Sequence, residues 1–313
     1  MNLIRGINNI KSAQQNCVAT IGNFDGVHLG HQKVLQQLVE KARAENLPAL
    51  VITFEPLPPE FFHADQAPAR LLLLREKIVQ LKKCGVDRVL CLRFNTALAS
   101  LAAADFVKTI LVEKLHIHTL IIGDDFRFGH KRQGDFALLQ KLGQQYGFAV
   151  VPTQTVKLDG HRIGSSVVRA ALAEGDLGQA AILLGRPFTL SGHVIYGDQR
   201  GRQLGFPTAN ISLRRRVLPL LGVFAVRVHG LAEQPLPGVA NVGRRPTVDG
   251  KRRLLEVYLL DFNREIYGKR IEVEFIKKLR DEKRFDSLEE LKVQIERDVG
   301  EGRRVMVRLL SNP

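Results

Sequence analysis

Short apolar runs alternate with amphipathic segments over residues 15–155 of the chain. Each run has the length and composition of a buried strand. The runs are Cys17–Ile21, Ala49–Phe54, Arg88–Leu92, Thr119–Ile122 and Ala149–Val151. The helical spacing between them predicts helices over Gln32–Ala44, Arg70–Cys84 (with Leu71–Leu74 as one turn), Ala103–Lys114 and Phe136–Tyr146. This alternation predicts an α/β fold, a parallel sheet with helices on both faces.

The pattern changes after residue 185. Residues 164–184 have the pattern of two short helices, which end at Gly185-Arg186-Pro187. The apolar runs that follow are short and separated by turns, as in a small antiparallel β-barrel. They are Phe188–Tyr196, Val223–Val228, Gly238–Val242, Leu254–Leu260 and Ile271–Phe275. A C-terminal helix is predicted over Ser287–Val299, with Ser287 as its N-cap. We therefore predict two domains, residues 1–185 and 186–313.

The formal net charge of +14 favours anionic partners, such as nucleotides, nucleic acid or acidic lipid. Basic clusters occur at Arg214–Arg216, Arg244-Arg245 and Lys251–Arg253. Aromatic residues are not interleaved with these clusters, so the stacking surface of a nucleic-acid-binding protein is not indicated. Solvated surface charge is the simpler interpretation of the clusters.

Cysteine use and hydropathy indicate a cytoplasmic protein. The three cysteines, Cys17, Cys84 and Cys91, form no C-x-x-C pair and no zinc spacing, so we expect reduced thiols. Met1–Lys11 lacks the long apolar core of a secretory signal. No run approaches the ~18 apolar residues of a membrane span, so no membrane partner is expected.

Candidate chemistry gathers where the first predicted strand meets the first predicted helix. The string Gly22–His31 places His28 and His31 at a helix N-terminus, whose free N–H groups and positive dipole end attract phosphate. Gly26 and Gly30 leave room for a ligand close to the backbone. Imidazoles at this position suit a phosphate that gains charge in a transition state.

A second glycine-rich segment lies in the other half of the chain. Gly197, Gly201 and Gly205 precede a predicted strand, and the backbone N–H groups of such a loop can wrap phosphate. The segment is not a Walker P-loop, because neither Gly-Lys-Ser/Thr nor a helix follows it. Spacing alone leaves both phosphate binding and an ordinary turn open.

The string Gly22–His31 resembles the (H/T)-x-G-H motif of nucleotidyltransferases, and in full it is similar to the adenylyltransferase domain of bacterial FAD synthetases. Three later blocks also resemble that family. They are Thr53–Pro56, Gly123–Gly129 and Ser165–Arg169, the last similar to an I-S-S-x-x-R motif. Gly164 stands in place of the Ile, and Leu73 stands where we expect a polar residue. The resemblance implies a Rossmann-like nucleotidyltransferase domain.

The same resemblance implies roles for individual residues. His28 and His31 would stabilise the α-phosphate of ATP while the phosphate of FMN attacks it, and Arg169 would hold the leaving pyrophosphate. The other residues implied in ATP or phosphate binding are Gly22, Asn23, Phe24, Asp25, Gly30, Ser165 and Ser166. Those implied in flavin binding are Phe54, Pro56, Asp124, Phe126 and Arg127. For Asp25, Asp124 and Asp125, contacts to ribose, flavin or Mg²⁺ stay open.

The string Gly201–Asn210 resembles the G-R-x-L-G-F-P-T-A-N motif of riboflavin kinases, and Leu255–Phe262 also matches that family. The resemblance implies that Thr208 and Asn210 hold Mg²⁺ and ATP phosphates, since hydroxyl and amide oxygens suit that ion. Glu256 would be the general base that takes a proton from the flavin ribityl hydroxyl. The other implied phosphate-binding residues are Gly197, Gly201, Arg202, Gly205 and Pro207, and Arg280 would line the flavin pocket.

Together the two halves predict a bifunctional enzyme of flavin cofactor synthesis. Riboflavin and ATP would give FMN and ADP in the barrel, and FMN and ATP would give FAD and pyrophosphate in the first domain, both with Mg²⁺. One alternative is a nucleotidyltransferase for another phosphorylated alcohol with an accessory barrel, which would have no need of residues 197–210. Another is a nucleic-acid-binding protein that uses the basic second half.

Overall fold

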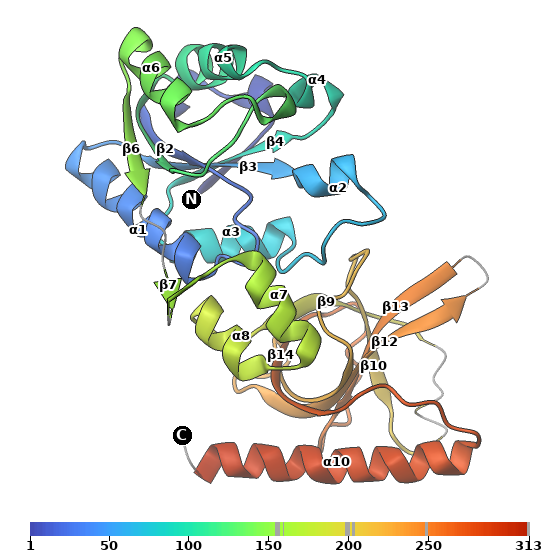
Figure 1. Ribbon diagram of the computed structural model, residues 1–313. Coiled ribbons are helices and arrows are strands. Elements are labelled where there is room, and N and C mark those ends of the chain that lie inside the picture. The colour runs from blue at the N-terminus through green and yellow to red at the C-terminus, as the bar shows by residue number, and fades with distance from the viewer. Residues whose placement is uncertain (154–156, 159, 198–200, 202–203, 248–249, 312–313) are drawn as a thin grey trace. The chain divides into compact units, whose positions relative to one another are not determined.

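The computed structural model describes residues 1–313 apart from 154–156, 159, 198–200, 202–203, 248–249 and 312–313 (Figure 1). Its contacts group the chain into two compact units. The N-terminal unit comprises Met1–Pro68 and Leu72–Ser165, and the C-terminal unit comprises Ala69–Leu71 and Ser166–Pro313. The predicted domain boundary near residue 185 stays a prediction. Among the described helices, none is long and apolar enough to cross a membrane.

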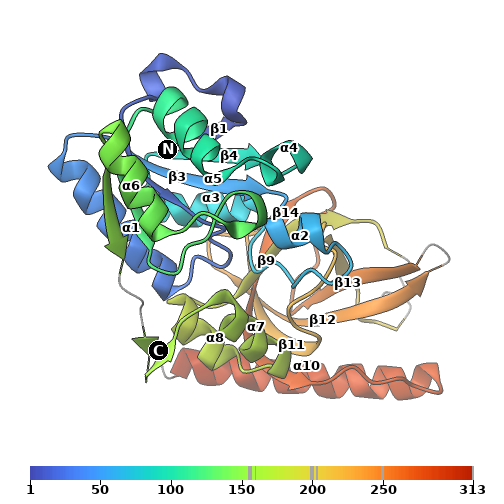
Figure 2. The same cartoon turned by 45° about the horizontal axis from the view of Figure 1, so that its top comes forward.

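The N-terminal unit is built on a parallel six-stranded sheet with the order β1-β4-β3-β2-β5-β6. The strands are β1 (Asn2–Arg5), β2 (Cys17–Ile21), β3 (Ala49–Glu55), β4 (Arg88–Arg93), β5 (Ile117–Gly123) and β6 (Ala149–Thr153). Five of the six are the predicted strands. The edge strand β1 was not predicted, because only two apolar residues, Leu3 and Ile4, mark it; Asn2 pairs with Arg88 of β4 (Figure 2).

Helices cover both faces of this sheet, as predicted (Figure 1). On one face α1 (Leu29–Ala44) and α3 (Leu74–Lys83) pack on inward residues such as Val51 and Val89. On the other, α5 (Ala103–Phe106), the π-helical segment η3 (Val107–Lys114) and α6 (Phe136–Tyr146) pack on the alternate residues, such as Ile52. The shorter elements are η1 (Ile7–Asn9), η2 (Ser12–Gln14), α2 (Pro58–Phe62), α4 (Thr96–Ala99), η4 (His130–Arg132), β7 (Lys157–Leu158) and β8 (His161–Arg162).

One predicted helical turn was wrong. Helix α3 begins at Leu74, and Leu71–Leu74 does not form a helical turn. The backbone of Leu71–Leu73 is not helical, because Leu72 N donates its hydrogen bond to the Asp25 carboxylate (3.0 Å). Leu73 is the N-cap of α3, a position where polar residues are preferred. Leu73 has no side-chain acceptor, and only the reverse bond of a capping box is present: the Glu76 carboxylate accepts the hydrogen bond from Leu73 N (2.7 Å).

The C-terminal unit begins with α7 (Ser165–Glu174), whose first residue belongs to the N-terminal unit, and α8 (Leu177–Leu184). A closed antiparallel barrel follows, with the order β10-β13-β12-β11-β14-β9, which confirms the predicted barrel. Its strands are β9 (Thr189–Ile195), β10 (Thr208–Ser212), β11 (Gly222–His229), β12 (Leu236–Thr247), β13 (Gly250–Leu259) and β14 (Arg270–Arg280). Phe224 and Phe275 are among its largest fully buried side chains.

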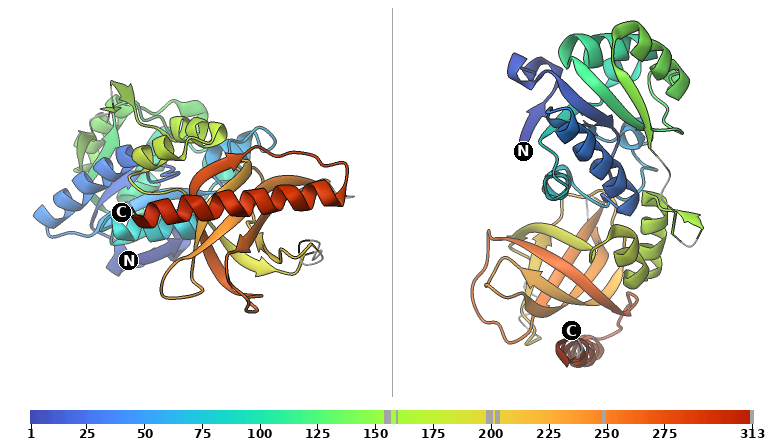
Figure 3. Two further views of the ribbon diagram at one scale, coloured as in Figure 1. Left: turned by 90° about the horizontal axis from the view of Figure 1, so that it is seen from below. Right: turned by 90° about the vertical axis from the view of Figure 1, so that its left-hand side faces the viewer.

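The C-terminal helix α10 (Leu288–Ser311) lies along the outside of the barrel (Figure 3). It runs well beyond the predicted end at Val299, through Gly300 and Gly302. Packing explains Gly302, because a Cβ there would lie 2.6 Å from Val239 Cγ2. Ser287 Oγ accepts a hydrogen bond from Glu290 N (3.2 Å), as expected of an N-cap.

These two glycines give opposite predictions for alanine substitutions in α10. Glycine in a helix interior costs about 1 kcal/mol relative to alanine, and a Cβ at Gly300 meets no described atom within 4 Å. G300A should therefore stabilise the unit by up to about 1 kcal/mol. G302A should destabilise it, since overpacking costs about 1–3 kcal/mol. Urea unfolding of the full chain, with hydrogen exchange of α10 peptides, measures both; effects of the same sign would contradict this packing.

Candidate functional site

The loop between β2 and α1 places His28 at the start of a helix. Phe24 and Val27 anchor the loop: both are buried, and both have positive φ, 46° and 43°, which non-glycine residues rarely adopt. His28 is the N-cap of α1, and its Nδ1 accepts a hydrogen bond from His31 N (3.3 Å). A neutral His28 therefore carries its proton on Nε2, where it can be donated to a ligand.

His31 stacks on His28, with ring centroids 3.7 Å apart and an interplanar angle of 18°. Part of the His31 surface is exposed, but its Nδ1 is buried and has no hydrogen-bond partner among the described residues. A buried polar atom without a partner is costly, and such atoms gather at functional sites. The imidazole pair therefore has the features of a preformed binding site.

Burial lowers the pKa of His31 well below its ordinary value, and neighbouring His28 and the positive charge of Lys77 lower it further. Lys77 is 1% exposed on α3. Its Nζ donates a hydrogen bond to Thr53 Oγ1 (3.4 Å), and Thr53 Oγ1 in turn donates to the carbonyl oxygen of Asn23 (3.4 Å). A buried cation thus supports the motif loop and adds to the effect of burial, which is the main cause of the lowered pKa of His31.

A cavity of about 280 Å³ lies beside the imidazole pair. It is lined by His28 and His31, by Gly123–Asp125 after β5, and by residues 162–165 at the start of α7. The structure thus brings together three of the predicted blocks at the carboxyl edge of the sheet, where such folds bind ligands. Arg162, which was not predicted, pairs with Asp125 (2.5 Å) and holds the pKa of that carboxyl below its usual range. No motif marked this arginine.

Asp25 is buried within the motif loop, with 2% of its surface exposed. Besides accepting from Leu72 N, it accepts a hydrogen bond at its carbonyl oxygen from Ser165 Oγ (2.8 Å). Ser166 and Arg169 follow on α7 in the C-terminal unit, where Arg169 Nε donates to the carbonyl oxygen of Ala69 (2.6 Å). The contacts of Asp25 suit a positioning role.

The predicted flavin-binding residues fall into two groups. Phe126 stacks on Phe128 (centroids 5.6 Å apart) and packs on the core, while Arg127 is exposed and donates to the Phe126 carbonyl oxygen (3.1 Å). Phe54, next to Glu55-Pro56, belongs to an aromatic cluster at the ends of β3 and β4.

That cluster contains three rings that sequence reasoning missed: Phe61, Phe62 and Phe94. The Phe94 ring lies 5.5–5.7 Å from those of Phe54, Phe61 and Phe62, and Phe62 is 57% exposed. The sequence signal was an aromatic pair just after Pro58-Pro59. An exposed aromatic cluster beside the ligand edge of a sheet suits a flat ring.

In the C-terminal unit, strand register assembles a polar row across three strands. Glu256 of β13 lies opposite Asn210 of β10 on one side and opposite Asn241 of β12 on the other. Thr208 shares the face of Asn210, because residues two apart in a strand point the same way. Directly opposed residues have Cβ atoms about 4.5–5.5 Å apart. Residues far apart in sequence therefore form one set of oxygen donors.

Part of this row opens into a cavity of about 330 Å³, which Asn210 does not line. Glu256, Asn241 and Thr208 line one part of it, and Leu291 and Ile295 of α10 line another. Arg280, a predicted flavin-pocket residue, also lines it. Within the described residues, no group of three or more His, Cys, Asp or Glu side chains could hold a metal ion.

The predicted glycine loop is described in part. Arg202 lies outside the described residues, as do 198–200 and 203. Gly201 lines the 330 Å³ cavity, and a Cβ there would lie 2.4 Å from the carbonyl oxygen of Phe206. At Gly197 a Cβ would meet the Asn210 side chain. Pro207 lines a second cavity, of about 250 Å³, and Gly205 has a positive φ of 88°.

The fold and the two sites define a two-unit enzyme of nucleotide chemistry, an α/β nucleotidyltransferase unit joined to an antiparallel barrel. Residues 10–167 match the FAD synthetase family, and residues 184–306 match the riboflavin kinase family. The chain is 56% identical over 299 residues to the bifunctional riboflavin kinase/FMN adenylyltransferase of Escherichia coli K12, covering 95% of this chain and 96% of that protein. The Pseudomonas fluorescens protein of the same name is 52% identical, with 97% of each chain covered.

A solved structure supports the fold of the whole chain. The crystal structure described as a macrolide-efflux protein from Streptococcus pneumoniae is 31% identical, covers 96% of this chain and 98% of that one, and has a TM-score of 0.81. The chain belongs to the family of bifunctional riboflavin kinase/FMN adenylyltransferases.

The charge of Lys77 should be visible in the titration of His31. K77M removes one cause of the lowered pKa, so the pKa of His31 should rise in this variant but stay below its ordinary value, because burial is the larger cause. K82M, an exposed position on the same helix, is the matched control and should leave it unchanged. NMR titration of labelled histidines measures this, with His31 assigned from H31Q.

The lowered pKa of His31 also makes the stability of the folded unit depend on pH. Below the unfolded pKa of about 6.5, the unfolded chain takes up a proton at His31 that the folded unit rejects, so stability should fall as pH falls. A His31 that titrates near 6.5 in the folded protein would contradict the electrostatics described above.

Proposed function

We propose that the N-terminal unit transfers the adenylyl group of ATP to FMN at the His28–His31 pair, and that the C-terminal unit phosphorylates riboflavin at Glu256. Membership of the family supports both activities. The observation that carries the two-site assignment is that the imidazole pair and the Glu256 row lie in different units, each beside its own cavity. The products are FAD with pyrophosphate in one unit and FMN with ADP in the other.

Adenylyl transfer needs no nucleophile from the protein. An FMN phosphate oxygen attacks the α-phosphorus of ATP, and the bond to the β-phosphate breaks to release pyrophosphate. His28 Nε2–H donates to an α-phosphate oxygen as its charge grows, and the free N–H groups at the start of α1 add to this field. Neutral His31 holds the His28 ring by stacking.

The remaining roles in this unit stay proposals. Gly22, Asn23, Phe24 and Gly30 supply the backbone path around the phosphates, with Asp25 holding that path in place. Ser165, Ser166 and Arg169 hold the leaving pyrophosphate. The FMN ring lies at the cluster of Phe54 and Phe62, and Pro56, Asp124, Phe126 and Arg127 are retained as flavin contacts.

Riboflavin phosphorylation requires a base, because the attacking group is a hydroxyl. Glu256 takes the proton from the ribityl hydroxyl as its oxygen attacks the γ-phosphorus, and the bond to the β-phosphate breaks to release ADP. The flat ring lies along the Leu291 and Ile295 wall of the cavity. Gly197, Gly201, Arg202, Gly205 and Pro207 are proposed to cradle the phosphates of ATP.

Mg²⁺ fits the donor set of the barrel. The Thr208 hydroxyl and the Asn210 amide oxygen are hard donors on one face, opposite Tyr258 and Glu256 in register. When bound, Mg²⁺ neutralises charge on the ATP phosphates.

A cytoplasmic location also remains our proposal. Cys17, Cys84 and Cys91 are free thiols, and burial raises the pKa of Cys17 to about 12, which leaves it unreactive.

Two substitutions should separate the activities. H28N keeps an N-cap acceptor but loses the imidazole, so FAD formation should fall about 10²–10³-fold while FMN formation is unchanged. E256Q should lower FMN formation roughly 10²–10⁴-fold and spare FAD formation when FMN is supplied. Chromatography of flavins over time measures both products. If either substitution removed both activities from a folded protein, the two-site assignment would be wrong.

The aromatic cluster makes a separate prediction. F62A removes an exposed ring, so KM for FMN in adenylyl transfer should rise. The rise should correspond to the loss of one ring stack, which is worth roughly 1–3 kcal/mol. Riboflavin phosphorylation should be unaffected. V79A, an exposed apolar position on α3, is the control. Equal KM values for F62A and V79A would place the FMN ring elsewhere.

A further inference from the structure

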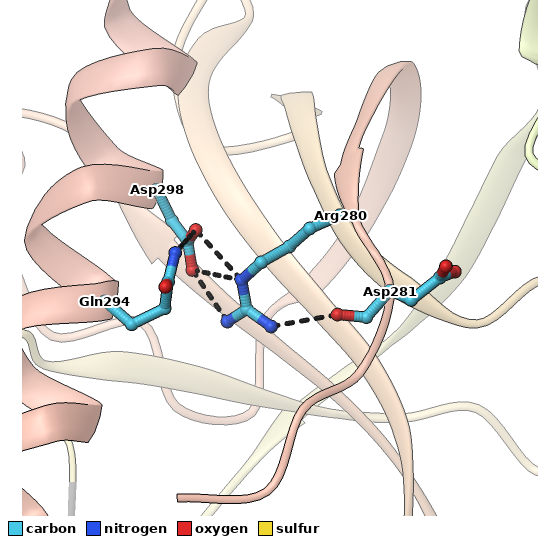
Figure 4. A network of polar contacts seen from close by, with 4 residues as sticks. All are labelled: Arg280, Asp281, Gln294 and Asp298. Atoms are coloured by element: carbon cyan, nitrogen blue, oxygen red, sulfur yellow. Dashed lines mark hydrogen bonds and ion pairs between the residues drawn. The ribbon is translucent and has the colours of Figure 1, made fainter.

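A partly buried ion pair joins the barrel to α10 at the wall of the proposed flavin cavity (Figure 4). Asp298 Oδ1 and Oδ2 both accept from Arg280 Nε (3.0 Å each), and Oδ2 also accepts from Arg280 Nη2 (2.8 Å). Gln294 Nε2, one turn earlier on α10, donates to Asp298 Oδ1 (2.9 Å). Asp298 is 6% exposed, and both it and Arg280 line the 330 Å³ cavity.

Each nitrogen of the Arg280 guanidinium donates a hydrogen bond to the protein. Its Nε and Nη2 face Asp298, and its Nη1 donates to the carbonyl oxygen of Asp281 (2.9 Å). The Phe285 ring lies 5.7 Å from its central carbon. Arg280 thus borders the cavity with three of its five N–H donors bonded to the protein. We therefore replace the prediction that it binds flavin with a prediction that it positions the cavity wall.

Asp298, the partner of Arg280, lies on the same turns of α10 as the apolar residues that line the cavity. Leu291, Ile295 and Val299, spaced four residues apart, line the cavity together with Asp298. Residues at this spacing share one helix face. Any shift of this part of α10 relative to the end of β14 would move the wall and change the width of the cavity.

We propose that the Arg280–Asp298 pair, braced by Gln294, is a positioning device that sets the width of the flavin cavity and thereby the affinity of the barrel for riboflavin. This inference rests on the proposed kinase function of the C-terminal unit. A buried charge pair contributes little net stability over an apolar pair, but its forked geometry fixes relative position well. Its loss should therefore affect substrate binding more than catalysis at Glu256.

The chain offers a matched control on the same helix. Arg303 of α10 forms a fork with Asp261, just after β13, at 2.6 Å and 2.7 Å. Neither residue lines the cavity, and both are exposed. Asp261 has a positive φ of 53°, which Asn also tolerates, so D261N removes charge without backbone strain. This second pair fastens α10 to the barrel but does not border the proposed substrate.

The test compares D298N with D261N in the full-length protein, by initial rates of riboflavin phosphorylation and by riboflavin binding from flavin fluorescence. D298N should raise KM and Kd for riboflavin about 10–100-fold, with kcat within 3-fold and KM for ATP unchanged. Q294L should raise KM about 3-fold, and D261N should leave all values within 2-fold. FMN adenylylation with FMN supplied should be unchanged throughout.

A double variant protects the test against misfolding. R280M/D298L removes both charges and leaves no uncompensated ion, so it should fold and still show the raised KM of D298N. R280K, which keeps one hydrogen bond but not the fork, should raise KM for riboflavin less than the double variant does.

Three results would overturn the inference: an unchanged KM in D298N or in the double variant, a fall in kcat alone, or an equal rise in KM for D261N. Wild-type protein without riboflavin phosphorylation would instead overturn the proposed function.

Discussion

The N-terminal site depends on one buried residue of the motif loop, Asp25, and on both its carboxylate and its backbone carbonyl oxygen. Asp25 accepts a hydrogen bond from Leu72 N through its side chain and from Ser165 Oγ through its carbonyl oxygen. These partners lie 47 and 140 residues away along the chain. One residue thus fixes the loop after β2, the entry to α3 and the first residue of α7. The strained φ values of Phe24 and Val27 persist because this network and their burial determine the loop's path.

The two units solve related chemical problems with different elements. In adenylyl transfer the attacking group is already an anion, so the protein needs donors for growing charge, and we propose that the helix N-terminus with its two imidazoles supplies them. In riboflavin phosphorylation the attacking group is a neutral hydroxyl, so a base is also needed. A strand can hold Glu256 between Asn210 and Asn241 at fixed spacing, which a loop cannot do as accurately.

The alternation of apolar runs with amphipathic segments predicted the α/β unit, because strands such as Cys17–Ile21 are buried on both faces and are continuously apolar in sequence. Short apolar runs separated by turns predicted the barrel. The pattern missed β1, which has only two apolar residues, and it started α3 too early, since a hydrogen bond from distant Asp25 decides the path of Leu72. Local motifs singled out His28 and Glu256, and each of these residues lines a cavity. Arg162 and Phe94 carry no local signal, because tertiary contacts alone bring them to their sites.

Buried charge is a shared means of tuning both sites. Lys77 lies beneath the motif loop, where its charge disfavours a proton on His31 and so preserves the neutral ring. Asp298 holds Arg280 at the cavity wall, and each group meets the hydrogen-bonding needs of the other. In both cases desolvation makes the charge expensive, so it persists only where geometry compensates it. Apolar side chains of equal volume could replace Lys77 or Asp298 and fill the same space. They could not lower the pKa of His31 by charge, nor hold Arg280 in a fixed orientation at the cavity wall.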